Sequence, residues 1–292
     1  MATGEIVEAR VDGMRRPTQR LMRAVRYGRR VAGYYGRVTA ARLHLVRSWT
    51  GYGRFLIVGK GRTGTNFLRL MLDDHPAVIA HGELFREHDR VDSRLVRPLQ
   101  SSRALRQKLT DPVEFIEEKV FRPLPRSVGA VGFKLFYYHA REPDWRVVWD
   151  HLQRDDRVKV LHMTRRDDLA TLVSLQRAQQ SGNWVGTSTA DLPRLTLTPE
   201  ECEEAFRGTL RWREDLASAF PPERVHEVVY EDLVADPSGI IEGVQRFLGL
   251  EVEALTAGSV RQSSGPTADA VANYEELRSH FSGTLWEAWL GG

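Results

Sequence analysis

The chain has little cysteine, little lysine and no long hydrophobic run. Cys202 is the single cysteine, so no disulfide can form within the 292 residues, and we expect a reducing compartment. The CxxC and HExxH patterns are absent, and we expect no metal site. No apolar run approaches the roughly 20 residues that span a bilayer, and the N-terminus lacks the apolar segment of a signal peptide. These absences predict a cytoplasmic protein.

Acidic residues are missing from a long N-terminal segment. No Asp or Glu lies between Asp12 and Asp73, whereas 14 Lys or Arg do. We expect a basic helical extension over residues 1–50 and one main domain over residues 51–292. The extension has two interpretations: a solvated helix, or a peripheral contact of residues 13–50 with the inner membrane face. Because the net charge is only +3, we expect no nucleic-acid partner.

Short apolar runs alternate with amphipathic segments along the main domain. This order predicts an α/β fold of P-loop-like, three-layer α/β/α architecture, with a central parallel sheet covered by helices on both faces. Two polar segments, 86–110 and 181–199, are predicted to be an exposed excursion and a surface loop that is a candidate substrate lid. Strands are predicted at 55–58, 78–80, 131–136, 158–163 and 225–230, and helices from residue 65 and at 112–120, 145–152, 167–180, 199–217 and 237–248.

A glycine-rich loop follows the first predicted strand, where residues 54–67 read RFLIVGKGRTGTNF. A strand that turns tightly into a helix points backbone N–H groups and the positive end of the helix dipole at one spot, which suits a phosphate or sulfate. Gly59 and Gly64 have the spacing of the P-loop pattern GxxxxGK[ST], but Thr65 and Asn66 replace its Lys and Ser/Thr. The basic residue lies inside the loop instead, as Arg62. The loop therefore indicates an anion other than ATP.

A second motif ends the strand predicted at 158–163. Arg165 and Arg166 follow the strand, and Ser174 lies eight residues beyond Arg166 on the next helix. An arginine at the strand tip and a serine two helical turns further along would grip one phosphate from two sides. The alternative is an arginine that caps the sheet edge and a serine on a polar helix face.

Together, in this order and at this separation, the two motifs resemble the paired signatures with which sulfotransferases bind 3′-phosphoadenosine 5′-phosphosulfate (PAPS). The resemblance covers residues 54–286, and its late segments are similar to bacterial carbohydrate sulfotransferases, the branch of the nodulation-factor and trehalose enzymes. It implies that Arg166 and Ser174 hold the 3′-phosphate, with Arg165 as an accessory and Arg261 nearby. The loop residues that it implies for the 5′-phosphosulfate are Lys60, Gly61, Arg62, Thr63, Gly64, Thr65, Asn66 and Phe67.

Sulfuryl transfer to a hydroxyl needs a base and charge stabilisation. The trehalose type uses a glutamate 21 residues past the loop arginine, which corresponds to Glu83, whereas animal enzymes use a histidine, for which His81 is the rival. Lys134 lies within an apolar strand, where an unpaired ammonium is costly. The resemblance implies that Lys134 and Arg62 stabilise charge on the transferring group.

The sequence therefore predicts a sulfotransferase that moves the sulfuryl group of PAPS to an acceptor hydroxyl, without a metal, and releases adenosine 3′,5′-bisphosphate (PAP). A carbohydrate or glycolipid acceptor is favoured. The alternatives are a small natural product or phenol as acceptor, a P-loop kinase, and a non-catalytic module that binds anions or glycans.

Overall fold

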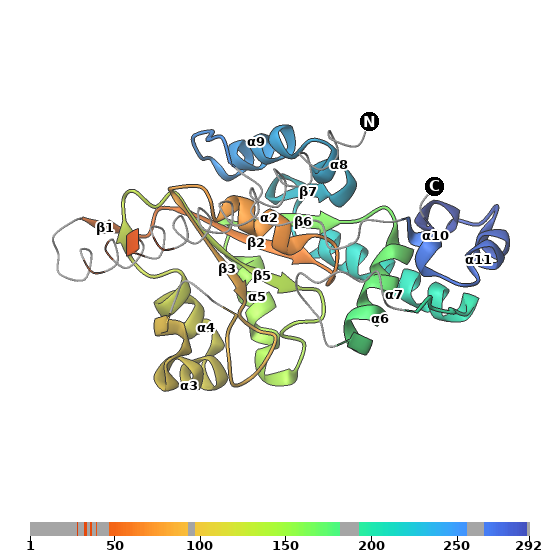
Figure 1. Ribbon diagram of the computed structural model, residues 1–292. Helices are drawn as coiled ribbons and strands as arrows, with labels where there is room; N and C mark the ends of the chain where they lie inside the picture. Colours follow the sequence, from red (N-terminus) through yellow and green to blue (C-terminus); the bar gives the residue numbers. More distant parts are fainter. Residues whose placement is uncertain are drawn as a thin grey trace, which may run out of the picture. The chain divides into compact units, whose positions relative to one another are not determined.

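A computed structural model describes residues 47–92, 97–181, 193–255 and 266–290, together with the single positions 28, 32, 33, 36 and 39 (Figure 1). The chain separates into two compact units, one of residues 1–50 with 123–127 and one of residues 51–122 with 128–292. Most of the expected basic extension, and with it the expected membrane contact, lies outside the described residues.

In the smaller unit, two short strands pair in antiparallel fashion. They are β1 (Ser48–Trp49) and β4 (Leu124–Pro125). The guanidinium of Arg126 lies 5.5 Å from the centroid of the Trp49 ring, within the range of a cation–π contact.

In the larger unit, five parallel strands form a sheet in the order β3-β5-β2-β6-β7, which confirms the predicted central parallel sheet. β2 and β5 are buried almost along their whole length, as expected for strands covered on both faces. The carboxyl ends of parallel strands meet at one edge, where ligands of such folds bind. The strands are β2 (Gly53–Gly59), β3 (Val78–Glu83), β5 (Ala130–Phe136), β6 (Val158–Thr164) and β7 (Val225–Val229).

Helices cover both faces of this sheet: in Figure 1, α8 and α9 lie above it and α3, α4 and α5 lie below it. The helices are α2 (Thr65–Leu72), α3 (Ser102–Thr110), α4 (Pro112–Phe115), α5 (Arg146–Arg154), α6 (Asp168–Ser181), α7 (Pro199–Ala219), α8 (Tyr230–Ala235), α9 (Pro237–Leu248), α10 (Thr267–Ala270) and α11 (Tyr274–Phe281). Short turns of other helix types are η1 (Arg97–Gln100), η2 (Ile116–Val120), η3 (Pro143–Trp145), η4 (Pro222–Arg224) and η5 (Glu287–Trp289).

Two predictions about these elements were wrong. The segment 86–110, predicted to be an exposed excursion, contains the helix α3, which begins after Ser101; the Ser101 hydroxyl accepts a hydrogen bond from the Ala104 N–H. Tyr230 was predicted to end a strand, but it is the first residue of α8. Residues 182–192 of the predicted lid lie outside the described residues, and no lid function is assigned.

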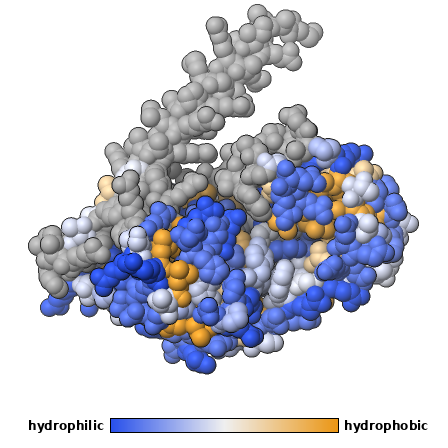
Figure 2. Space-filling view, turned by 90° about the horizontal axis from the view of Figure 1, so that it is seen from below, coloured by the Kyte–Doolittle hydropathy of each residue, from blue (hydrophilic) through white to orange (hydrophobic). Residues whose placement is uncertain are grey.

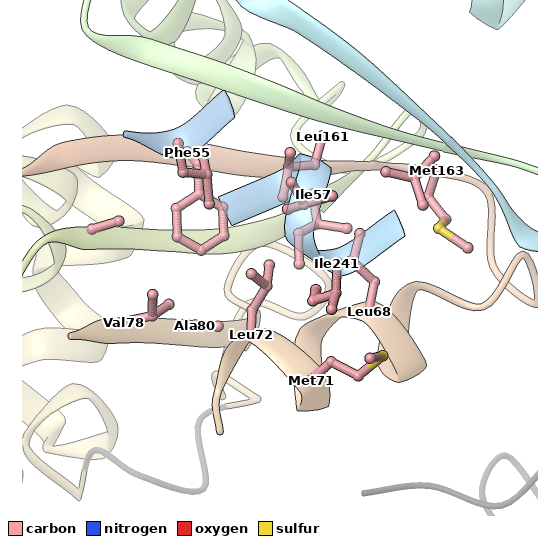
Figure 3. Close-up of a cluster of buried hydrophobic side chains, with 14 of the residues drawn as sticks. Phe55, Ile57, Leu68, Met71, Leu72, Val78, Ala80, Leu161, Met163 and Ile241 are labelled. Atoms are coloured by element: carbon pink, nitrogen blue, oxygen red, sulfur yellow. The ribbon is translucent and has the colours of Figure 1, made fainter. Parts of the chain in front are cut away.

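An aliphatic core fills the space between the sheet and α2 and α9 (Figure 3). There Ile57 of β2 points toward Leu68 of α2 and Ile241 of α9, and Phe55 of β2 points toward Leu72 of α2. Truncating one such buried aliphatic side chain to Ala costs about 2–5 kcal/mol of folding free energy. This packing fixes α2, and therefore the loop that precedes it, against the carboxyl end of β2.

An aromatic core covers the opposite face. Phe85 contacts Phe115, Phe133 and Trp145, with ring centroids 5.5 to 6.1 Å apart. Phe85 comes two residues after the end of β3, so this cluster holds the segment that leaves the sheet at Glu83.

The surface is largely hydrophilic in the view of Figure 2, with hydrophobic residues in limited patches. Among the described residues no helix combines the length and the apolar character needed to cross a membrane. Five large hydrophobic or aromatic side chains there are exposed, and Tyr138, with 43% of its surface exposed, is the one aromatic among them. They are Leu109, Tyr138, Val147, Val252 and Leu285.

Candidate active site

The glycine loop has a backbone that few side chains would tolerate. Gly64 has φ +89°, and a Cβ there would lie 2.4 Å from Cδ2 of Tyr230. Arg62 also has a positive φ of 72°, a conformation that is uncommon outside glycine. The hydroxyl of Thr63 donates to the carbonyl of Lys60 at 2.7 Å, a bond that closes the turn. The loop is therefore a fixed, tightly packed turn between β2 and α2.

The helix α2 begins at this loop without a side-chain cap. Its N-cap residue is Gly64, and among the described residues no side-chain cap bonds the start of the helix. Thr65 is buried, Asn66 is exposed, and Phe67 packs against the aliphatic core. An uncapped helix start has N–H donors and a positive dipole end that suit an anion.

A β-bulge sets the direction of the Glu83 side chain. Val78 and Ala80 of β3 face the aliphatic core on the α2 side. Strict alternation would then turn residue 83 to the opposite face. The register shifts between His81 and Glu83, so that Glu83 pairs with Lys134 of β5. The bulge thus brings a carboxylate beside the lysine at the carboxyl end of the sheet.

Glycine is required at the bulge. A Cβ on Gly82 would lie 2.3 Å from the carbonyl oxygen of Asp92, whose own N–H donates to the Glu83 carbonyl. Gly82 therefore permits the close approach that turns Glu83 toward Lys134.

Three side chains from three elements meet at this point. The ammonium of Lys134 lies 2.8 Å from Oε1 of Glu83 and 3.0 Å from Oδ1 of Asn66, the second residue of α2. The Lys134 side chain is 1% exposed and that of Glu83 is 12% exposed. Removing one partner of such a buried pair leaves an uncompensated charge, which costs about 3–5 kcal/mol. The cluster joins β3, β5 and the start of α2.

The Glu83 carboxyl is held in its charged form. Burial raises the pKa of the Glu83 carboxyl, but the charge and hydrogen bond of Lys134, together with the charge of Arg86, outweigh burial, so the pKa lies below its ordinary value. Burial lowers the pKa of the Lys134 ammonium, and Glu83 opposes that shift. Glu83 is therefore an ionised carboxylate at neutral pH, able to accept a proton.

His139 completes the surroundings of Glu83. Its Nε2 lies 3.9 Å from Oε2 of Glu83. Burial lowers the pKa of His139 to about 4, so the ring is neutral at pH 7. Its Nδ1 accepts a hydrogen bond from the N–H of Phe136 at 3.2 Å, which leaves the proton on Nε2, on the side of Glu83.

His81, the rival base, lies on the other face of the sheet. It is paired with Phe133, whereas Glu83 is paired with Lys134. Its side chain is 3% exposed, and burial together with Arg122 and Arg69 lowers its pKa to about 3. The structure thus joins Glu83, and not His81, to Lys134 and Asn66.

The ammonium of Lys60 bonds side chains of two later helices rather than groups of the glycine loop. This ammonium donates to Oδ2 of Asp168 at 3.2 Å and to the hydroxyl of Thr209 at 3.0 Å, and Lys60 is 6% exposed. These contacts anchor the loop to α6 and α7. The ammonium thus already has two buried partners, and the binding of an anion by Lys60 stays a prediction.

Two arginines lie close together beside the loop. Arg62 donates from Nε to the hydroxyl of Ser174 at 2.8 Å, and Arg165 donates to the Arg62 carbonyl at 3.4 Å. Burial, and then the like charge of Arg165, lower the pKa of Arg62. An anion placed here would relieve the repulsion between the two guanidinium groups.

The predicted pair of Arg166 and Ser174 is not in contact here. Both terminal nitrogens of Arg166 donate to the carboxylate of Asp232, at 2.8 and 2.7 Å, whereas Ser174 accepts from Arg62. The Arg166 side chain is 58% exposed. Arg261 lies outside the described residues.

Sequence reasoning missed Lys108, which supports the segment after Glu83. Lys108 is fully buried, and its ammonium donates to the carbonyls of Leu84, Glu87 and Arg90 at 3.3, 2.5 and 2.7 Å. A buried lysine in a polar, arginine-rich segment shows no hydrophobic periodicity that would have identified it.

Among the residues that the structure describes, no group of three or more His, Cys, Asp or Glu side chains is arranged to hold a metal ion.

Residues 54–254 match the sulfotransferase family. The chain is 30% identical over 236 residues to nodulation protein H of Rhizobium tropici, covering 78% of this chain and 89% of that protein. It is 29% identical over 239 residues to nodulation protein H of Rhizobium meliloti, covering 78% and 91%.

Among solved structures, it resembles a sulfotransferase from Alicyclobacillus acidocaldarius, with a TM-score of 0.46 and 20% identity over 78% of this chain and 90% of that chain. It also resembles mouse sulfotransferase SULT7A1 complexed with PAP, with a TM-score of 0.39 and 14% identity over 81% and 70%. The family match and the identity to nodulation protein H carry the assignment: this chain belongs to the sulfotransferase family and is a sulfotransferase.

Proposed function

We propose that the enzyme transfers the sulfuryl group of PAPS to a hydroxyl of a carbohydrate or glycolipid and releases PAP. The observation that carries this proposal is the contact of Lys134 with both Glu83 and Asn66, because it puts a carboxylate and a buried cation at the start of α2, beside the glycine loop. A proton acceptor and an anion site thus lie side by side.

In this proposal the loop and α2 hold the 5′-phosphosulfate. The N–H groups at the start of α2 and the guanidinium of Arg62 bind its oxygens. Arg166 and Ser174 bind the 3′-phosphate, with Arg165 as an accessory. Because Arg166 now bonds Asp232 and Ser174 bonds Arg62, both contacts are exchanged when the donor binds.

The reaction is an in-line displacement at sulfur. The acceptor hydroxyl oxygen forms a bond to sulfur while the bond between sulfur and the 5′-phosphate oxygen breaks, and the electron pair of that bond stays on the phosphate. Glu83 takes the proton of the hydroxyl. Lys134 and Arg62 stabilise the charge on the transferring group, so catalysis rests on positioning and fixed charge.

Glu83 is preferred over His81 as the base because of its position in the sheet. The carboxylate shares a face with Lys134, whereas His81 lies on the opposite face and is buried. The neutral Nε2–H of His139 stands near the carboxylate and helps to orient it.

Support for a carbohydrate acceptor comes from the similarity of the late segments to bacterial carbohydrate sulfotransferases and from the identity to nodulation protein H.

We also propose that the basic residues 13–50 bring the enzyme to an anionic membrane surface, where a glycolipid would be presented. Deletion of residues 1–48 should then abolish binding to vesicles with anionic lipid; unchanged binding would contradict the membrane contact.

A transfer assay with labelled PAPS tests the function. The acceptors are trehalose, chitotetraose, a bacterial glycolipid extract, 4-nitrophenol and a tyrosine peptide. We expect sulfate transfer to one of the carbohydrates. Transfer to 4-nitrophenol or the peptide alone would contradict the carbohydrate acceptor.

A second experiment tests which nucleotide the site binds. The Tm is measured with PAP and with ATP plus Mg²⁺, and a rise in Tm with ATP alone would contradict a PAPS site.

A further inference from the structure

Tyr138 lies beside the glycine loop. It lies two residues beyond the end of β5 and four beyond Lys134. Its hydroxyl accepts a hydrogen bond from the N–H of Gly61 at 3.3 Å. Gly61 directly precedes Arg62, so the phenol lies against the part of the loop that bears the loop arginine.

The same side chain also lies near the proposed base. The Tyr138 ring meets the His139 ring edge to face, with centroids 5.2 Å apart, and His139 approaches Glu83. Phe136 and Trp212 hold the ring on other sides, at 5.6 and 5.8 Å between centroids. Tyr138 therefore lies beside both the glycine loop and the histidine next to Glu83, where the proposed function puts the sulfuryl group and the acceptor hydroxyl.

The Tyr138 hydroxyl can donate a hydrogen bond. It accepts from Gly61, but no described residue accepts the proton of Tyr138 in return. Burial raises the pKa of Tyr138 to about 12, so the phenol keeps this proton across the working pH range. A phenol O–H beside an anion loop, with no acceptor among the described residues, is a donor available to an anion.

We propose that Tyr138 is a further catalytic residue, whose O–H donates a hydrogen bond to a sulfuryl oxygen of the bound donor during transfer. This inference rests on the proposed function of the same site. PAP lacks the sulfuryl group, so the contact distinguishes PAPS from PAP. It strengthens as charge moves through the transferring group.

The test compares two adjacent tyrosines. Tyr138→Phe removes only the hydroxyl, and we expect kcat for the carbohydrate that the wild type sulfates to fall about 10²-fold. The affinity for PAP should stay within about twofold, and the preference for PAPS over PAP in calorimetry should fall several-fold. Tyr137→Phe is the matched control: its hydroxyl bonds His162 in the interior at 2.5 Å, so its loss should lower Tm and leave kcat unchanged.

A second variant, at Gly61, tests the same contact between Tyr138 and the glycine loop. A Cβ on Gly61 would lie 2.9 Å from the Tyr138 hydroxyl, so Gly61→Ala should displace the phenol and lower kcat as Tyr138→Phe does. A Tyr138→Phe enzyme with kcat within twofold of wild type, or with equal losses of PAP and PAPS affinity, would overturn the proposal. A wild-type protein that binds neither nucleotide would instead refute the proposed function.

Discussion

The two ends of the proposed donor site differ in how they are built. At the reaction end, Glu83 and Lys134 form a buried pair, with side chains 12% and 1% exposed. At the 3′-phosphate end, Arg166 and Asp232 form an open pair, with side chains 58% and 45% exposed. Both are ion pairs at the carboxyl edge of the sheet, yet only the first is shielded from water.

The buried pair suits catalysis, and the exposed pair suits reversible binding of a ligand. A buried charge pair is already oriented and is little screened, so it can stabilise a transition state without rearrangement. An exposed pair is screened by water and contributes little, so it exchanges easily for a ligand phosphate. We therefore expect variants at the reaction end to change kcat and variants at the 3′-phosphate end to change affinity.

The largest expected effect is that of Glu83→Gln at the reaction end. The amide keeps the shape but cannot take the proton, so kcat should fall about 10²- to 10⁴-fold, as expected for loss of a general base. PAP affinity should change little in calorimetry. His81→Ala should leave kcat within a few-fold of wild type; if it causes the loss instead, the base is His81.

Arg62→Ala comes next. It removes the cation that we place on the phosphosulfate, and kcat should fall about 10²- to 10³-fold, while circular dichroism shows an intact fold. Arg246→Ala, which removes an exposed arginine paired with Glu242 on α9, is the control and should retain full activity. An active Arg62→Ala enzyme would remove this arginine from the mechanism.

Lys108→Met tests whether the segment after Glu83 must be held in place. Three buried carbonyls lose their donor, so kcat should fall about 10- to 100-fold through misplacement of the carboxylate. Lys159→Met is matched, since Lys159 also bonds a carbonyl, that of Phe247, and lies over its ring. It should lower Tm without lowering kcat; equal kcat in both variants would contradict the positioning role.

The smallest effects are expected at the open pair. Arg166→Ala should weaken PAP binding about tenfold, the loss of one charged contact, with kcat at saturating PAPS little changed. Asp232→Ala should tighten PAP binding a few-fold, because the arginine is no longer held by a carboxylate. Calorimetry that shows equal PAP affinity in Arg166→Ala would place the 3′-phosphate elsewhere.

Much of the fold could be predicted, because apolar runs mark the buried strands directly. Helix α9 (Pro237–Leu248) lies where the sequence predicted it, between Pro237 and the glycine that ends it. Helix α3 escaped prediction because its buried positions are Ala104 and Lys108. Hydrophobic periodicity is measured from apolar residues alone. Lys108 is buried with its ammonium bonded to three carbonyls, but lysine counts as polar, so it adds nothing to the pattern.

The site was predictable in its residue types but not in its contacts. The glycine spacing identified the loop, yet nothing in the sequence pairs Lys60 with Asp168, 108 positions away. The spacing of Arg166 and Ser174 suggested a shared phosphate, whereas the folded chain gives them different partners. Such pairings depend on how α6 and α8 pack, which no local pattern encodes.

The tie between Lys60, Asp168 and Thr209 bears on how this loop can be engineered. A chimera that receives residues 59–66 from this chain, without an acid and a hydroxyl at the matching places on two later helices, would bury a cation with no partner. The glycine loop therefore cannot be transferred to another protein on its own. Its transfer between relatives requires that two distant positions, those of Asp168 and Thr209, be exchanged together with the loop.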